Sequence, residues 1–323
     1  MSTQQTKAPH YCFLVVDTPY CVHGWNLADQ AKNYLARIDA EYFSFIATLL
    51  DPEITTDRSR YASIAVRVSY YQCLEALFAL LGALLQAPSY PLGWLQLYRN
   101  ADLLALVASI SNGKHILNRV GLEKSSWENV SAYVHADLSN APDGLVDAFS
   151  LLWRRLAAEY VSKDFRAEYN SIKHGYRLGA GGFTFSFGPE TVPGVPAAAE
   201  DMRILGGSAH GSTFYTVDTF DGKLPSPRRP HVALRQVSLN WSAEATVLKL
   251  QLASWSLNNV ISRLRLMHGF SLSEEAFYMP VPLSEIETPW NTTVGVTRCE
   301  WHRPLHSESI DKCDLSTVAS SYK

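Results

Sequence analysis

One segment, from about residue 57 to 87, constrains the fold more than any other part of this sequence, because it is helical in pattern and apolar around most of its circumference. Tyr61 and Val68 lie on one predicted face, while Cys73 and Leu77 lie on another. A helix that is apolar on most sides must be covered by other elements. We therefore expect this helix at the centre of a helical bundle.

The same segment contains the longest apolar run of the chain, Ala76 to Leu85, with Glu75 before it and Gln86 after it. This run is well short of the ~20 residues that a membrane span needs. We therefore expect a buried core helix and no contact with a membrane.

Three- and four-residue spacings of apolar side chains predict further helices along the chain. They cover residues 26–49, 92–111, 145–175 and 243–268, and Ser125 or Ser126 caps a short additional helix. Between residues 180 and 240 the pattern changes to a period of two, which is typical of strands. The strand candidates are 183–187, 212–217 and 232–239, and a further short strand is expected through Val294, Val296 and Arg298.

These patterns predict a mainly α fold, namely a helical bundle with a small β insert and a C-terminal helix. We expect residues 26–178 to form the bundle and residues 179–240 to form the β insert. Residues 241–323 are expected to form the C-terminal helix and an irregular tail that packs on the bundle.

The charge of the chain limits how it can bind a polyanion. Its 28 Lys and Arg residues and 31 Asp and Glu residues give a formal net charge of -3. A chain without a global basic field must bind nucleic acid through a local patch.

The five cysteines are an odd number scattered over a long chain, which argues against a disulfide framework. Because the N-terminal residues lack the apolar stretch of a secretory signal, we expect a reducing, cytoplasmic setting.

A local patch is predicted near the end of the helical pattern over 145–175. Arg166, Asn170 and His174 stand at positions i, i+4 and i+8, with Lys173 beside them, so on one helix they form a polar stripe. Histidine transfers protons near neutral pH, and Arg or Lys stabilises charge on a phosphate. This combination can cleave RNA without a metal. The alternative is a solvated helix face that ends in a C-capping histidine.

Residues 169–175, Tyr-Asn-Ser-Ile-Lys-His-Gly, resemble the HEPN superfamily. That family carries an Arg, usually followed by a polar residue such as Asn, and a His four to six residues after the Arg. Here Asn170, Lys173 and His174 match, and Tyr169 stands where the family has Arg. The resemblance implies an α-helical bundle that often forms dimers, with metal-independent endoribonuclease chemistry in active members.

We therefore expect a HEPN-like protein that acts on RNA without a cofactor and forms a homodimer. In an active version His174 assists attack of a ribose 2′-hydroxyl on the adjacent phosphate, and Asn170 orients the reacting group. Lys173 stabilises the charge, and Arg166 or Arg177 replaces the missing Arg. The alternative is a catalytically inactive module that uses the same face for dimerisation or for a partner protein.

Two groups of Cys and His residues offer metal ligands. One comprises His10, Cys12, Cys21 and His23, and the other comprises Cys299, His302, His306 and Cys313. Neither group has the Cys-x2-Cys knuckle of a familiar zinc finger, so we expect ordinary packing and no bound metal at either. The basic, Pro-rich loop 225–231 is interpreted as an exposed turn, with contact to a nucleic-acid backbone as the alternative.

Overall fold

The computed structural model describes residues 8–136, 138, 141–218, 232–271, 277–279, 283–301 and 322. These residues are 53% helical and 17% strand, and their strands form three small sheets. The expected mainly α fold is therefore wrong, and the described chain is a mixture of helices and sheets. The difference arises because residues 10–23, which were considered only as metal ligands, form a strand pair, and because the β segment contains two strands of eight residues.

The chain divides into two compact units. Unit 1 comprises the residues up to 170 together with 241–293, and unit 2 comprises 171–240 together with the residues from 294 onward. Unlike the expected division, this one places the residues after 294 with the strands of unit 2.

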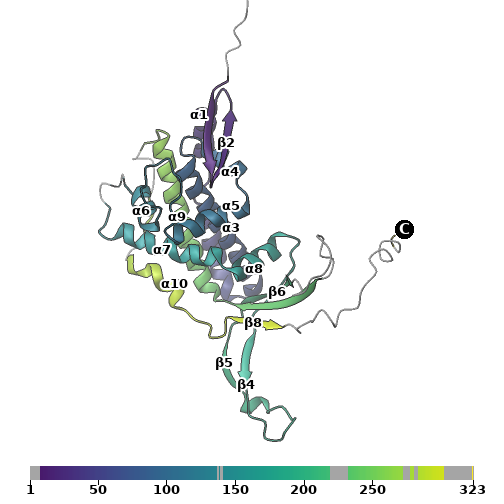
Figure 1. The fold of residues 1–323 in the computed structure, drawn as a ribbon. Coiled ribbons are helices and arrows are strands. Elements are labelled where there is room, and N and C mark those ends of the chain that lie inside the picture. Colours follow the sequence, from purple (N-terminus) through teal and green to yellow (C-terminus); the bar gives the residue numbers. More distant parts are fainter. Residues whose placement is uncertain are drawn as a thin grey trace, which may run out of the picture. The chain divides into compact units, whose positions relative to one another are not determined.

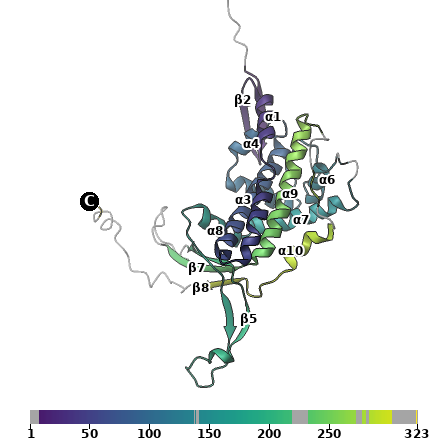
Figure 2. The ribbon, with the colours of Figure 1, turned by 180° about the vertical axis from the view of Figure 1, so that it is seen from behind.

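The core of unit 1 is built around α3 (Ser59–Gln86), which lies beside α9 (Ala243–Met267; Figures 1 and 2). Leu77 and Leu81 of α3 are at most 1% exposed. By length and composition α3 resembles a membrane span, a property that core helices share, and 72% of its apolar window is buried. The expectation of a central, buried helix is therefore confirmed.

Further helices of unit 1 surround this pair. They are the helices α1 (Leu27–Arg37), α2 (Tyr42–Leu50), α4 (Pro91–Leu97), α5 (Asn100–Ser111), α6 (Trp127–Val134), α7 (Leu145–Val161) and α10 (Thr288–Asn291), with short 3-10 turns at Pro52–Thr55 and Leu283–Glu287. Helix α8 (Lys163–Lys173) begins in unit 1, and its last three residues belong to unit 2.

The pattern over 26–49, expected as one helix, is broken into α1 and α2. Arg265 of α9 accounts for the break. Its guanidinium donates to the carbonyls of Leu35 and Ile38 at 2.8 and 3.0 Å, and so satisfies carbonyls at the end of α1 that would otherwise need further helix.

Two further expected helices are broken where a side-chain oxygen caps a new helix. Between α4 and α5, the Asp102 carboxylate accepts the backbone N–H of Arg99 at 2.9 Å. Between α7 and α8, the Ser162 hydroxyl accepts the backbone N–H of Phe165 at 3.2 Å. Such bonds satisfy backbone groups at a helix start, and they favour a new helix over continuation of the previous one.

An antiparallel hairpin, β1 (His10–Val15) and β2 (Thr18–His23), precedes α1. Its two-residue loop places Val16 at a φ of 58°, which is typical of such turns. The side-chain amide of Gln86 accepts the Val16 N–H at 2.8 Å and donates to the Val16 carbonyl at 2.9 Å. Because Phe13 is also only 2% exposed, the hairpin is anchored to the end of α3.

Unit 2 contains an antiparallel sheet with the order β3–β6–β7–β8 and a separate pair, β4–β5. The strands are β3 (Leu178–Ala180), β4 (Thr184–Phe187), β5 (Arg203–Gly207), β6 (Gly211–Asp218), β7 (Ala233–Asn240) and β8 (Arg298–Trp301). The strands expected at 183–187, 212–217 and 232–239 are confirmed. The strand expected through Val294 and Val296 begins only at Arg298.

Candidate functional site

The predicted polar stripe is only partly a single helix face. Arg166 and Asn170 lie on α8 in unit 1, and Lys173 is the last residue of this helix. His174 follows the helix, and Gly175 then adopts a positive φ of 91° that turns the chain. The helical pattern thus closes at Gly175, as the sequence predicts, with His174 directly after the last helical residue, and Arg177 lies beyond this turn.

The part of α8 that lies in unit 1 has one polar face and one face that packs into the core of this unit. Lys163 and Asn170 are exposed and Arg166 is half-buried, and the i, i+3, i+7 spacing puts all three on one side. Phe165 and Glu168, on the opposite side, are 4% and 0% exposed. The sequence pattern predicted this polar side correctly for Arg166 and Asn170.

A small cavity of about 50 Å³ lies beside this face. Its lining within unit 1 includes Glu75, Tyr160, Arg166, Tyr169 and Asn170. Ligand pockets usually measure ~300 Å³ or more, so this cavity is too small for a nucleotide. The Arg166 Nε also donates to the Ser162 carbonyl at 3.3 Å, within the first turn of α8.

Tyr169, which stands where the HEPN motif has Arg, has a structural contact. Its hydroxyl donates to the carboxylate of Glu75 on α3 at 2.6 Å. Burial and the neighbouring Glu75 raise the pKa of Tyr169 well above its ordinary value, so the hydroxyl keeps its proton. This position therefore links α8 to the core helix.

Glu168 of α8 is the centre of a buried polar network that the sequence analysis missed. Its carboxylate accepts hydrogen bonds from Arg67 at 2.9 Å, from the Tyr71 hydroxyl and from the Trp241 indole at 3.2 Å. Burial alone would lower the pKa of Arg67, but Glu168, together with Tyr71 and Glu159, outweighs that effect and raises the pKa above its ordinary value. The signal available in the sequence was a single Arg within an otherwise apolar stretch of α3.

Glu159 of α7 forms a second network in unit 1. Its carboxylate accepts from Lys249 at 2.6 Å, from the Trp290 indole at 2.7 Å and from the Tyr70 hydroxyl at 2.8 Å. Burial would raise the pKa of Glu159, but Lys249 and the nearby Arg67 together hold it below its ordinary value. Glu159 therefore stays ionised and compensated within unit 1.

These two networks change the charge that α7 and α8 present. The segment 154–177 has six basic and three acidic residues, a balance of 6 − 3 = +3. Two of the three acids, Glu159 and Glu168, are engaged inside unit 1, whereas Arg154 and Lys163 are exposed. Arg155 of the same segment pairs with Glu287 at 2.9 Å, so the charge that the segment exposes depends on these pairings and not on its composition alone.

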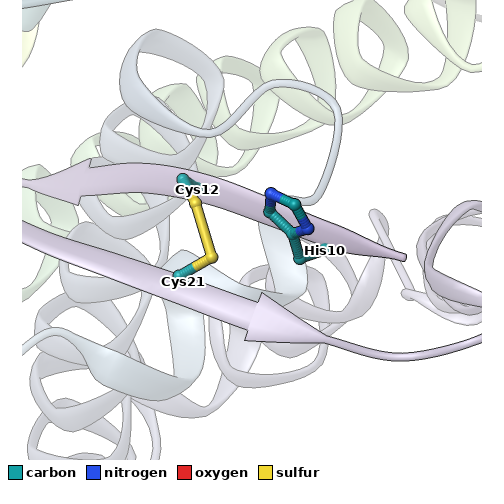
Figure 3. A group of neighbouring side chains, drawn as sticks. All are labelled: His10, Cys12 and Cys21. Carbon is teal, nitrogen blue, oxygen red and sulfur yellow. A yellow bond between two sulfur atoms is a disulfide. The ribbon is translucent and has the colours of Figure 1, made fainter. Parts of the chain in front are cut away.

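The Cys and His groups have different outcomes. The hairpin brings His10, Cys12, Cys21 and His23 to one face, and a disulfide joins the two cysteines, which the sequence analysis did not expect (Figure 3). Cys299 lies in β8. The other members of its group, His302, His306 and Cys313, and the loop 225–231 lie outside the described residues.

Compared with known proteins, the chain matches no family model, no curated protein and no solved structure. The resemblance to the HEPN superfamily therefore rests on residues 169–175 and their helical context.

Proposed function

We propose that this chain binds RNA through the polar face of α8 and does not cleave it. The observation that carries the proposal is the arrangement of Lys163, Arg166 and Asn170 on one side of α8, while Glu168 is bound inside unit 1. Cations on successive helix turns neutralise neighbouring phosphates, and an amide donates to phosphate or sugar oxygens. Lys173 extends the same helix by one more cation.

The absence of cleavage follows from the position of Tyr169. In the HEPN motif this position supplies an Arg, whereas here it carries a phenol bound to Glu75. Arg166, one of the two expected replacements, lies beside a cavity of about 50 Å³ that has no room for a nucleotide, and Arg177, the other, lies beyond the end of α8. The chain thus has cations for contact with RNA but no guanidinium at the position where the motif provides one.

Fluorescence anisotropy with a labelled single-stranded RNA over a series of salt concentrations tests the binding. The double substitution Lys163→Ala/Arg166→Ala should weaken binding and lower the slope of log K against log salt by about 1.4, because each lost phosphate contact removes ~0.7. The matched control Lys114→Ala/Lys124→Ala removes the same charge from two exposed positions elsewhere on unit 1 and should leave the slope unchanged. Equal effects of both double variants, or no binding by the wild type, would refute the proposal.

A labelled-RNA gel in the presence of a chelator tests the absence of cleavage. The wild type and His174→Ala should both leave the RNA intact. If the wild type cleaves and His174→Ala does not, the chain is a metal-independent endoribonuclease and the binding-only proposal fails.

A second candidate role is self-association through the outer face of α2. Tyr42, Phe45 and Leu49, at i, i+3 and i+7, are 49%, 62% and 53% exposed. A cavity of about 350 Å³ at the end of this row is lined by Leu49 and also by Glu53 and Arg58. A two-fold interface brings the same patch of both copies together. The opposite charges at its edge then pair Arg58 of one copy with Glu53 of the other.

Light scattering after size exclusion tests this role. Wild type should be a dimer, and Phe45→Glu should be a monomer because it places a charge in the apolar row. Leu117→Glu, at a position 54% exposed elsewhere on unit 1, is the control and should remain a dimer. A monomeric wild type would exclude the self-association.

A further inference from the structure

The strand register of the N-terminal hairpin brings together four side chains that are unevenly spaced along the sequence, His10, Cys12, Cys21 and His23. His10 lies opposite His23, and Cys12 lies opposite Cys21, two residues further along each strand. Alternate residues of a strand share a face, so all four side chains are on the same side of the hairpin. All four are exposed, while Phe13 on the other side is buried.

The ligand atoms on this face are close together. One ligand atom from each of His10, Cys12 and Cys21 lies within 4.8 Å of the others (Figure 3). The His10 and His23 rings have centroids 5.5 Å apart. A tetrahedral zinc ion needs ligand atoms about 3.3 to 3.8 Å apart, from its Zn–N and Zn–S distances of about 2.0 and 2.3 Å. The ligand atoms of His10, Cys12 and Cys21 thus lie at most about 1 Å beyond this spacing, and His23, opposite His10, is the candidate fourth ligand. Two thiolates and two imidazoles are a preferred zinc ligand set.

The backbone beneath this face is held by contacts that do not involve the sulfur atoms. The Gln86 amide makes two hydrogen bonds to Val16 in the loop, and the Arg119 guanidinium donates to the Cys12 carbonyl at 2.5 Å. Phe13 anchors the hairpin from the other side. The ligand positions thus remain in place when the disulfide is opened, which reduces the ordering cost of binding a metal.

We propose that His10, Cys12, Cys21 and His23 form a zinc site that is available only when the Cys12–Cys21 disulfide is reduced. A dithiol reductant transfers two electrons and two protons, so the S–S bond breaks, two thiols form and the reductant becomes a cyclic disulfide. Zinc then displaces the two thiol protons, which pass to the buffer, and binds both thiolates. Disulfide and zinc are alternative cross-links between the same two strands. This inference does not depend on RNA binding.

The test compares two redox states of the full-length wild type. One sample is reduced with dithiothreitol and desalted anaerobically, and the other is left oxidised. Each is titrated with Co²⁺ and, separately, with Zn²⁺ against a coloured chelator. The reduced chain should bind one equivalent and show the visible bands of tetrahedral Co²⁺ together with thiolate-to-cobalt charge transfer. The oxidised chain should show neither. Absence of these bands from the reduced chain, or equal binding by both states, would overturn the proposal.

Variants then identify the ligands. Cys12→Ser/Cys21→Ser should abolish the charge-transfer band, and His10→Ala/His23→Ala should weaken zinc binding by more than about tenfold because two of four ligands are lost. Cys299→Ser is the control, since Cys299 lies in unit 2, and it should bind as the wild type does. Loss of the site in Cys299→Ser, or full binding by either double variant, would contradict the assignment. The comparison of wild-type redox states needs no substitution, so it stands even where a variant does not fold.

Discussion

Acidification should destabilise unit 1 through His135, which follows α6 and is 4% exposed. Its ring lies against Phe149, with centroids 4.7 Å apart. Nδ1 is 2.8 Å from the Ser131 carbonyl, an acceptor, so Nδ1 must carry the proton of the neutral ring. Nε2 then accepts from the side-chain amide of Asn259 at 3.2 Å. The neutral imidazole therefore has both nitrogens satisfied.

Among the described residues, the partner of His135 Nε2 is the Asn259 side-chain amide, which donates and so does not accept a second proton. The Asn259 amide is fixed by the backbone of Tyr278, because its Nδ2 donates to the Tyr278 carbonyl at 2.9 Å and its Oδ1 accepts the Tyr278 N–H at 2.8 Å. It cannot rotate to offer oxygen to a protonated Nε2 without losing both bonds. Burial lowers the pKa of His135 from 6.5 to about 4.

The shift sets both the sign and the size of the effect. As the pH falls below 6.5, the unfolded chain takes up a proton that folded His135 does not bind until about pH 4. The contribution of neutral His135 to the free energy of unfolding is therefore complete above pH 6.5 and is lost as the pH falls toward 4. At 1.36 kcal/mol per pKa unit, the full loss is about 3 kcal/mol, and about 2 kcal/mol of it falls between pH 7 and pH 4.5.

Urea unfolding at pH 7 and pH 4.5 measures this loss. The free energy of unfolding of the wild type should fall by about 2 kcal/mol more than that of His135→Gln, whose amide does not titrate. Carboxylates titrate alike in both proteins, so their contribution cancels in the comparison. His115→Gln, at an exposed histidine, is the control and should behave as the wild type. An equal pH dependence in the wild type and His135→Gln would refute the reasoning.

Two further substitutions test the core of unit 1 by urea unfolding at pH 7. Leu77→Ala, at a fully buried position of α3, should cost about 2 to 5 kcal/mol, and a loss under about 1 kcal/mol would contradict its burial. Glu168→Ala should cost about 3 to 5 kcal/mol because it leaves the Arg67 guanidinium without its carboxylate, whereas Asp164→Ala, at the neighbouring partly exposed carboxylate on α8, should cost far less.

The hydrophobic periodicity of the sequence was sufficient to predict those helices and strands whose own residues show a clear pattern. The burial of α3 follows from its apolar circumference, and β6 and β7 follow from their alternation. The break between α1 and α2 was not predictable in this way, because Arg265, which satisfies the end of α1, lies 230 positions from Leu35. The caps Asp102 and Ser162 are different, since both are local and were present in the sequence as polar residues within apolar patterns.

The hairpin shows a limit of another kind. His10, Cys12, Cys21 and His23 were recognised as ligands, but their spacing was compared with zinc-finger knuckles along the chain. In an antiparallel strand pair, the residues that lie opposite each other matter more than their spacing along the chain. Because the second strand reads Cys-x-His, the reverse of His-x-Cys, each His lies opposite a His and each Cys opposite a Cys. The apolar residues between them, such as Phe13, were the sign that these residues alternate between a buried and an exposed face.

The contact of Tyr169 explains why the motif alone could not settle the chemistry of α8. Its partner Glu75 lies 94 positions earlier, on the face of α3 that meets α8. Likewise, the charge of the polar face depends on Glu159 and Glu168, whose cationic partners come from α9 and α3. A count of charges along residues 154–177 assumes that these two acids neutralise the exposed lysine and arginines of the same segment. In the folded unit Glu159 of α7 pairs with Lys249 and Glu168 of α8 pairs with Arg67, so the charge that the two helices present follows from tertiary pairing and not from the segment alone.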